Sequence, residues 1–500
     1  MLPGHENRSV CLAQTKFQPP RLGQDFIVRR RLHDVLAAAV GDYALTLVSA
    51  LAGYGKTTLL ASFSSASAKM PLTWLSLDEE DNDPAHLILQ RLYVVNQLSW
   101  PSRIKEMHHY WQKHIFLYVL VFVSFFFMFH QFGVVPPPFP WSDEASAGQD
   151  AVATLNGHFR LHYPDQGGGG NLWVYLATLA FLLLEPNIFA LRWLAGVAGL
   201  FAVVFFYAAG LELFRTIAPP RKSHWLAFLS ALGLAVSTWH LIMSRVAWPP
   251  VLGSIAVSAM TFFLWRGLRT KRPQAFVGLG VIIGLSLYLY VPSRLIGLVV
   301  IIFLTIEAIL SFGQQKPILW RLLRYQFLLT IGMAVIVAAP MLGLYLAYPD
   351  TFTTRIEEVR IQTDTSSWLE QVSRNLYFYA DSFGFTLNLG RLPIDGLILG
   401  SITSILFLAG LLVAFWQIST PMSRYVLIWW FLLIIPGVVS PTLAYDPSIL
   451  RRVIGILPVT FIFPVLALYF LEVKSKNWLA VLSTGKISFS TFMTQSLPYP

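Results

Sequence analysis

Residues 189 to 213 read FALRWLAGVAGLFAVVFFYAAGLEL, and this stretch decides the class of fold. A helix needs about 20 predominantly apolar residues to cross the hydrocarbon core of a bilayer, and this run is long enough. Nine further runs of the same kind lie at 115-135, 225-243, 250-265, 275-291, 295-312, 326-348, 394-416, 425-439 and 453-472. The sequence therefore predicts a mainly α, polytopic membrane helical bundle of about ten transmembrane helices.

Composition supports a membrane class. The chain has 500 residues, of which 55% are hydrophobic and 12% charged, whereas soluble domains carry about 25% charged residues. The net charge of +10 comes from basic residues scattered between apolar runs, which favours membrane topology, and we expect no nucleic-acid partner. With Cys11 as the only cysteine, an intramolecular disulfide and a cysteine metal cage are excluded.

The positions of Lys and Arg orient the predicted spans. Cytoplasmic loops are enriched in these residues. If 115-135 leaves the cytosol and the short run 172-184 lies in the outer interface, every compact basic cluster falls inside. Those clusters are Arg215, Arg221 and Lys222; Arg266, Arg269, Lys271 and Arg272; Lys316, Arg321 and Arg324; Arg424; and Lys474 and Lys476. We therefore expect 172-184 to be an interfacial helix, and both termini to be cytosolic in a multi-pass protein of the cell membrane.

The first hundred residues have a different, soluble composition. They lack the charged-then-apolar profile of a cleavable signal, so we expect them to remain cytosolic. Segment 43-50 is typical of a buried strand, AGYGKTTLL at 52-60 of a glycine loop opening a helix, and 71-84 of a second strand. This order predicts a small partial α/β P-loop fragment. The expected division is a fragment over 1-100, a membrane domain over 101-476 and a cytosolic tail over 477-500.

The glycine loop departs from a complete nucleotide site. A phosphate loop has the pattern G-x-x-x-x-G-K-[ST], and here Ala50 takes the first glycine position while Gly55, Lys56 and Thr57 follow in register. Hydrolysis also needs a carboxylate that holds Mg²⁺. The acidic run 78-83 lies in the turn after the second predicted strand and does not end a Walker B strand.

AGYGKTTLL and TWLSLDEEDNDPAHL (73-87) together resemble the start of the ATPase module of the MalT-like regulators of the LuxR family, within the STAND class of NTPases, over about residues 20-95. The resemblance implies nucleotide contacts from Gly53, Gly55, Lys56, Thr57 and Thr58. Leu51 replaces that family's proline, and the other motifs of the family are missing. We expect a vestigial segment, from a truncated fusion or a gene boundary, in which ATP is not functional.

The candidate chemistry lies in the outer loops. PPPFPWSDEASAG (136-148) places Asp143 and Glu144 just after the first span. Adjacent carboxylates can supply a general base or share Mg²⁺ or Mn²⁺; a solvated loop containing the same pair is the alternative.

Arginines recur at three outer turns: Arg245 in SRVAWPP, Arg294 in YLYVPSRL, and Arg451 with Arg452 in YDPSILRRVIGILP. Outer positive charge calls for an anionic partner such as a phosphate, although a lone arginine can also anchor a helix at the interface.

These strings, with GGGGNLWVYL (167-176), ALRWLAGVAGL (190-200), WHLIMSRVAWPP (239-250) and GLSLYLYVPSRL (284-295), resemble the GT-C glycosyltransferases over about residues 105-472, especially the bacterial branch related to protein O-mannosyltransferases and the aminoarabinose transferase. The resemblance implies transfer of a sugar from a polyprenyl-phosphate donor to a lipid, glycan or protein acceptor on the outer side. Asp143 matches the catalytic aspartate, Glu144 its companion, and Arg245, Arg294, Arg451 and Arg452 the donor-phosphate contacts.

Relatives commonly have a charged residue followed by Pro-Leu where this chain has Gly170, Asn171 and Leu172. Asp165 and Asn171 are therefore the candidates for the second polar contact in this loop. No cofactor is required by such a reaction, because the donor phosphoester carries the energy.

Two other classes remain open. A transporter or flippase of lipid-linked saccharides would have a similar number of spans, but it typically carries ionisable residues near mid-span, whereas here they cluster at the outer turns. A membrane-tethered ATP-binding regulator would need the missing Walker B element.

Overall fold

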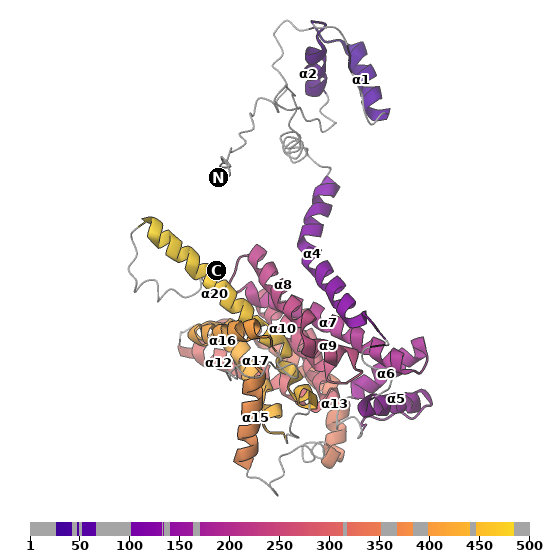
Figure 1. Ribbon diagram of the computed structural model, residues 1–500, viewed down its shortest axis with the longest axis vertical. Helices are drawn as coiled ribbons and strands as arrows, with labels where there is room; N and C mark the ends of the chain where they lie inside the picture. The colour runs from indigo at the N-terminus through magenta and orange to yellow at the C-terminus, as the bar shows by residue number, and fades with distance from the viewer. Residues whose placement is uncertain are drawn as a thin grey trace, which may run out of the picture. The chain divides into compact units, whose positions relative to one another are not determined.

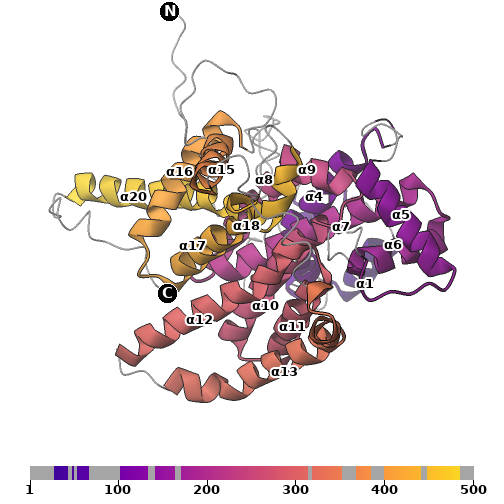
Figure 2. The same ribbon diagram turned by 90° about the horizontal axis from the view of Figure 1, so that it is seen from below.

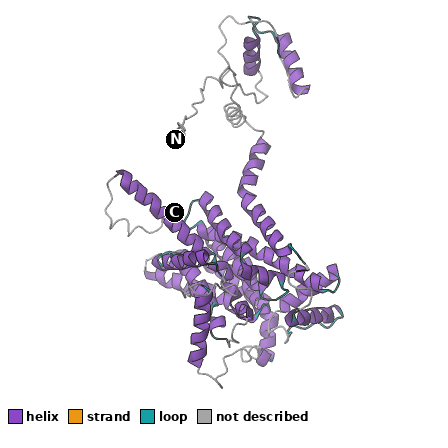
Figure 3. Ribbon diagram, in the orientation of Figure 1, coloured by secondary structure: helices purple, strands orange, loops and turns teal. Residues whose placement is uncertain are grey.

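The computed structural model describes residues 27–42, 48–49, 53–66, 102–132, 134, 141–163, 171–313, 318–351, 368–383, 399–440 and 447–484. The chain divides into two compact units, Met1–His114 and Ile115–Pro500. Within the described ranges every regular element is a helix (Figure 3).

The first unit contains α1 (Arg30–Asp42) and α2 (Lys56–Ala66), and α4 (Ser102–Phe129) begins within it. Val48 and Ser49 have no regular structure, while the rest of the predicted strand 43-50 and all of the second strand at 71-84 lie outside the described residues. The glycine loop itself is described from Gly53. Gly53 and Gly55 have φ values of 85° and 72°, a left-handed conformation that glycine adopts without strain, and α2 starts at the next residue, Lys56.

The second unit is a bundle of helices (Figure 1). The first helices along the chain are α5 (Ser142–Leu155), α6 (Asn171–Leu184), α7 (Ile188–Phe214), α8 (Pro220–Val236), α9 (Thr238–Arg245), α10 (Val251–Thr270) and α11 (Pro273–Leu285). The 3₁₀ turns η4 (Ser286–Tyr288) and η5 (Val291–Leu295) follow, and then α12 (Ile296–Gly313), α13 (Ile318–Ala347) and α15 (Trp368–Ser382). The last elements are α16 (Ser401–Trp416), α17 (Pro421–Leu433), α18 (Ile435–Val438), the 3₁₀ segment η6 (Pro447–Ile456), α19 (Leu457–Thr460) and α20 (Ile462–Thr484).

The described residues of each predicted span are mainly helical, but not every helix is long enough to cross a membrane alone. Six helical stretches of the described chain meet the length and hydropathy of a span: Ile188–Phe214, Val251–Thr270, Val291–Ser311, Tyr325–Ala347, Pro421–Val438 and Leu450–Ser475. The run predicted at 225-243 is the pair α8 and α9, bent by 59°. The runs at 115-135, 275-291 and 394-416 give shorter apolar helices.

Helix α6 corresponds to the predicted interfacial segment. Its 14 residues extend about 21 Å at about 1.5 Å per residue, which is less than the hydrocarbon thickness of about 30 Å. Its last turn exposes Leu182, Leu183 and Leu184. A short helix with an exposed leucine surface is suited to lie along the boundary of the bilayer rather than across it.

Helices pack closely where one of them presents a small residue. Helix α11 lies beside α13 (Figure 2), with Gly280 facing the backbone of Thr330. Helices α16 and α20 also pack together, and a side chain at Gly410 would overlap the carbonyl oxygen of Phe463. Small residues allow such close approach of helices in membranes.

We expect Gly410→Ala to lower the melting temperature of the detergent-solubilised protein markedly, because the added methyl group meets backbone that cannot rotate away. Overpacking costs about 1–3 kcal/mol, and a backbone clash belongs at the upper end. Gly343→Ala in α13 is the matched control, since nothing lies within 4 Å of a Cβ there. Equal melting temperatures for the two variants would show that α16 and α20 do not approach as described.

Candidate functional site

The first turn of α5 carries both predicted carboxylates, and they have different environments. The Glu144 side chain is fully buried, whereas that of Asp143 is 47% exposed. Both lie at the helix N-terminus, where the positive end of the helix dipole favours negative charge. Glu144 also accepts a hydrogen bond from the backbone N–H of Trp141 at 3.0 Å, as in the reciprocal half of a capping box.

Glu144 forms a bidentate ion pair with Arg192, in the first turns of α7. Arg192 donates from Nε to Oε1 at 3.0 Å and from Nη2 to Oε2 at 2.9 Å, and its side chain is only 1% exposed. The backbone N–H of Ala247, in the turn between α9 and α10, donates to Oε1 at 2.8 Å. One buried carboxylate thus joins α5, α7 and the turn before α10.

These contacts assign Glu144 a structural position. Four N–H groups already bond its two oxygens, so the residues present do not fit the predicted Mg²⁺ or Mn²⁺ site at Asp143 and Glu144. The described part of the chain also contains no group of three or more His, Cys, Asp or Glu side chains that could hold a metal ion. Sequence reasoning overlooked Arg192, although an arginine inside an apolar span signals a buried partner.

Asp143 contacts Arg451, which lies 308 residues later in η6. Arg451 donates from Nη1 to Oδ2 of Asp143 at 2.5 Å, and its guanidinium lies over the Trp248 ring, 5.9 Å from the ring centre. The Nε of Arg451 and the indole Nε1 of Trp248 are both buried, and neither has a hydrogen-bond partner within the described residues. Four other indole N–H groups, those of Trp173, Trp239, Trp265 and Trp430, are also buried without a partner in the described residues, so these two donors are available to a ligand oxygen but do not by themselves identify one.

The three outer turns predicted from the sequence gather at the start of α10. A side chain at Gly253 would contact Ser293 Oγ of η5 at 3.0 Å and Ile454 of η6 at 3.1 Å, and η5 packs against η6. Trp429 fixes η6 by donating from its indole to the carbonyl of Gly455 at 2.8 Å. The turns that carry Arg294 and Arg451 are therefore neighbours.

The remaining predicted arginines have partners of their own. Arg245 donates to the carbonyls of Phe127 and His130 at 3.3 and 2.7 Å, so it caps the C-terminus of α4. Arg294 donates to the Tyr345 hydroxyl at 3.1 Å and lies over its ring.

Arg452 lies near Tyr379 of α15. Burial raises the pKa of Tyr379, and the positive charge of Arg452 opposes that rise. No described contact links Arg245, Arg294 or Arg452 to Asp143.

The two predicted loop candidates differ in what can be described. Asp165 lies outside the described residues. Asn171, the first residue of α6, is fully buried; its Oδ1 accepts from the backbone N–H of Tyr163 at 3.3 Å, and its Nδ2 lies 3.5 Å from the sulfur of Met341. It therefore connects Tyr163 with α13.

A cavity of about 630 Å³ lies on the opposite face of α5 from Asp143. Its lining comes from α5, α6 and the start of α7, including Glu144, Gly148, Val152, Phe181, Asn187 and Leu191. Neither Asp143 nor any of the predicted arginines lines it. The Asp143–Arg451 contact is consequently a separate site.

No protein-family model matches the chain. A small N-terminal part is similar to HTH-type transcriptional regulator MalT, with 47% identity over 73 residues to the protein of Serratia proteamaculans (strain 568) and 36% over 103 residues to that of Yersinia enterocolitica. These stretches are 15% and 21% of this chain but only 8% and 11% of the relatives. The chain therefore spans about a tenth of the curated relatives it matches.

The fold is similar to solved membrane glycosyltransferase structures. ArnT from Cupriavidus metallidurans in the apo state gives a TM-score of 0.49 at 13% identity, over 75% of this chain and 65% of that one. The oligosaccharyltransferase from Archaeoglobus fulgidus in the apo form gives 0.43 at 15% identity, over 76% and 53%. This chain covers less than two thirds of either. Both resemblances predicted from the sequence, to GT-C enzymes and to MalT-like regulators, are confirmed as resemblances.

We expect Glu144→Gln to destabilise the protein by about 3 kcal/mol or more, because it leaves the Arg192 charge buried without a counter-ion. Thermal unfolding in detergent measures the change. The control is Glu370→Gln, which breaks the exposed pair with Arg374 and should cost less than about 1 kcal/mol. A Glu144→Gln variant as stable as the control would contradict the structural position assigned to Glu144.

His162, in the loop before α6, gives a pH prediction. Burial and, secondarily, the positive charge of Arg294 lower its pKa. As pH falls below the unfolded value of about 6.5, the unfolded chain binds a proton before the folded protein does, so folding stability decreases on acidification.

We therefore expect the melting temperature of the wild type to fall more than that of His162→Gln between about pH 7 and pH 5. His158→Gln, in the same loop, serves as the comparison variant for the loss of a histidine. Parallel curves for the wild type and His162→Gln would contradict the prediction.

Proposed function

We propose that this protein is an integral-membrane glycosyltransferase that moves a sugar from a polyprenyl-phosphate donor to an acceptor hydroxyl at the membrane surface beside α5. The contact between Asp143 and Arg451 is the observation that carries the proposal. It joins a half-exposed carboxylate to a guanidinium that still has a buried, unbonded N–H. A base for the acceptor and a cation for the donor phosphate therefore stand side by side.

Asp143 is the proposed general base. Its Oδ2 accepts from Arg451, and the half exposure of its side chain leaves room for an acceptor hydroxyl. In the proposed step, the carboxylate takes the proton of that hydroxyl while the hydroxyl oxygen bonds to the anomeric carbon. The bond from that carbon to the phosphate oxygen breaks, and its electron pair leaves with polyprenyl phosphate.

Arg451 would stabilise the leaving group. Guanidinium N–H groups suit phosphate oxygens, and Nε of Arg451 and Nε1 of the Trp248 ring beneath it are unbonded in the described residues. Fixed donors aimed at developing charge in a site with little water are worth more than in bulk solvent. Arg294 and Arg452 on the neighbouring turns are proposed as further phosphate contacts, whereas Arg245 caps α4.

Transport of a lipid-linked saccharide fits the described charges less well. Transporters commonly place ionisable groups near mid-membrane, but α7 has no charged residue between Arg192 and Glu212. The bend between α8 and α9 is a feature that a transporter would share. We retain transport as an outcome of the test below.

The test is sugar release from radiolabelled polyprenyl-phosphate sugars by membranes that contain the wild type or a variant. We expect Asp143→Asn to lower turnover by about 10²- to 10⁴-fold, the usual contribution of a general base, and Arg451→Gln by about 10²- to 10³-fold. Asp350→Asn, which removes an exposed carboxylate after α13, and Lys56→Ala in the glycine loop should leave turnover unchanged.

Equal turnover by the wild type and Asp143→Asn would overturn the assignment of Asp143 as the base. If no donor is turned over but labelled saccharide accumulates inside sealed vesicles, transport replaces transfer. Loss of turnover in Lys56→Ala would instead make the nucleotide loop part of the activity.

A further inference from the structure

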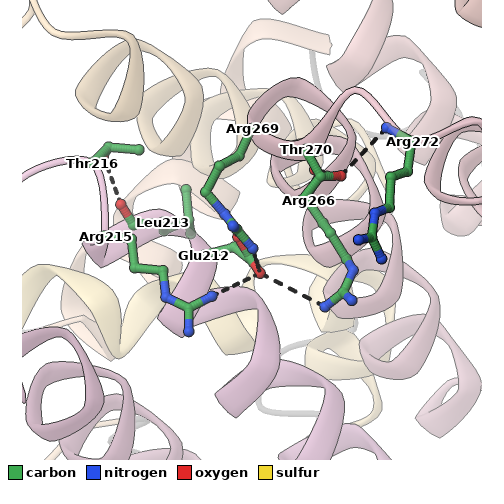
Figure 4. Close-up of polar contacts among 8 residues, drawn as sticks. All are labelled: Glu212, Leu213, Arg215, Thr216, Arg266, Arg269, Thr270 and Arg272. Carbon is green, nitrogen blue, oxygen red and sulfur yellow. Dashed lines mark hydrogen bonds and ion pairs between the residues drawn. The ribbon is translucent and has the colours of Figure 1, made fainter. Parts of the chain in front are cut away.

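A second cluster of charges lies at the other end of α7, around Glu212. Glu212 is 3% exposed. Arg269 of α10 binds its two oxygens with Nε at 2.6 Å and Nη2 at 2.7 Å, and Arg215 donates to Oε1 at 3.0 Å (Figure 4). Arg266 approaches the same oxygen at 3.9 Å. Three guanidinium groups from two helix ends thus surround one carboxylate.

The positive charges at this cluster outnumber the negative charges around them. Besides the three arginines, Lys271 and Arg272 follow α10 directly, and both are exposed. The C-termini of α7 and α10 contribute about half a negative charge each. Three arginines therefore face one carboxylate and two partial charges, with two more cations next in sequence, which leaves a net positive site.

Most N–H groups of the three arginines form no hydrogen bond within the described residues. A guanidinium has five N–H groups, yet within the described residues Arg215 uses one for Glu212 and Arg269 uses those on two nitrogens. Arg266 forms no side-chain hydrogen bond there and instead lies over the Phe262 ring, 5.3 Å from its centre. The side chains of these three arginines are 30%, 43% and 46% exposed for Arg215, Arg266 and Arg269, so a ligand can reach them.

The ion pair between Arg424 and Glu307 shows what a purely structural arrangement in the same protein looks like. Arg424 binds both Glu307 oxygens, at 2.6 and 2.9 Å, and its third nitrogen donates to the carbonyls of Ile418 and Ser419. One cation meets one carboxylate, and every nitrogen is bonded. The Glu212 cluster has additional arginines that a structural role does not require.

The length of α7 predicts that the cluster lies near a boundary of the bilayer. Glu212 follows Arg192 by twenty residues along α7, which is about 30 Å at about 1.5 Å per residue and equals the thickness of the hydrocarbon core. With Arg192 at one boundary, Glu212 falls at the other. Arg266, whose guanidinium lies over the Phe262 ring, is suited to keep its stem in hydrocarbon and its charge among headgroups.

We propose that Arg215, Arg266 and Arg269, held in place by Glu212 and joined by Arg272, bind the phosphate group of an anionic phospholipid headgroup at this surface. Basic pockets between transmembrane helices are a known setting for such lipids. Glu212 fixes the guanidinium planes before the lipid arrives, so less side-chain freedom is lost on binding. The site is independent of the Asp143 site, because it lies at the opposite end of α7.

The test uses the full chain in nanodiscs of phosphatidylcholine alone and of equal parts phosphatidylcholine and phosphatidylglycerol. We expect native mass spectrometry to show retention of phosphatidylglycerol by the wild type, and the mixture to raise the melting temperature. The variant is Arg266→Gln with Arg272→Gln, which leaves Arg269 and Arg215 to neutralise Glu212. Because each cation near a headgroup contributes about fivefold in binding, retention should fall on the order of tenfold or more.

Arg221→Gln is the matched control, since this exposed arginine starts α8 on the same predicted side and has no side-chain hydrogen bond or ion pair within the described residues. It should keep wild-type retention. Equal retention by the wild type and the double variant, or equal loss in the control, would overturn the proposal. A third arm adds glycerol phosphate to phosphatidylcholine nanodiscs. If this soluble anion reproduces the rise in melting temperature, the lipid assignment is wrong and the cluster binds a free phosphate ester.

Discussion

The buried ion pair between Glu144 and Arg192 is the interaction on which the rest of the site depends. Both side chains are removed from solvent, so each charge would be costly alone, and together they require that α5 docks on the start of α7. The same carboxylate holds the N–H of Ala247 and thereby the turn that carries Trp248. Asp143, one residue earlier in the first turn of α5, is placed beside Arg451 by this arrangement.

Two groups of charged residues in the second unit lie at opposite ends of α7. Arg192 and Glu212 mark the two ends of an uncharged stretch of α7 that matches the thickness of a bilayer core. At the Arg192 end, the two carboxylates in the first turn of α5 are each paired with an arginine, and one guanidinium N–H of Arg451 and the indole N–H of Trp248 are left unbonded in the described residues. At the other end, cations outnumber the single carboxylate. The two surfaces of the protein therefore have different chemistry, suited to different ligands.

Much of the fold could be predicted because apolar runs and helix length are linked by simple geometry. The described residues of each run are mainly helical, and the turns at Arg294 and Arg451 are neighbours. Side-chain partners were harder to predict, because a long arginine can reach a helix end or a carboxylate equally well. Arg245, a candidate phosphate contact, binds carbonyls at the end of α4, and Glu144, a candidate metal ligand, binds Arg192. The strands of the N-terminal fragment stay a prediction, since most of their residues lie outside the described chain.

The order of α5 and α7 along the chain bears on how this protein is made. Arg192 must enter the membrane boundary as a charge, and a translocating segment that carries an unpaired arginine is held back from the lipid. The residues of α5 are synthesised before those of α7, so the Glu144 carboxylate is already available when Arg192 emerges. Insertion of α7 can then proceed as pairing rather than as burial of a lone charge.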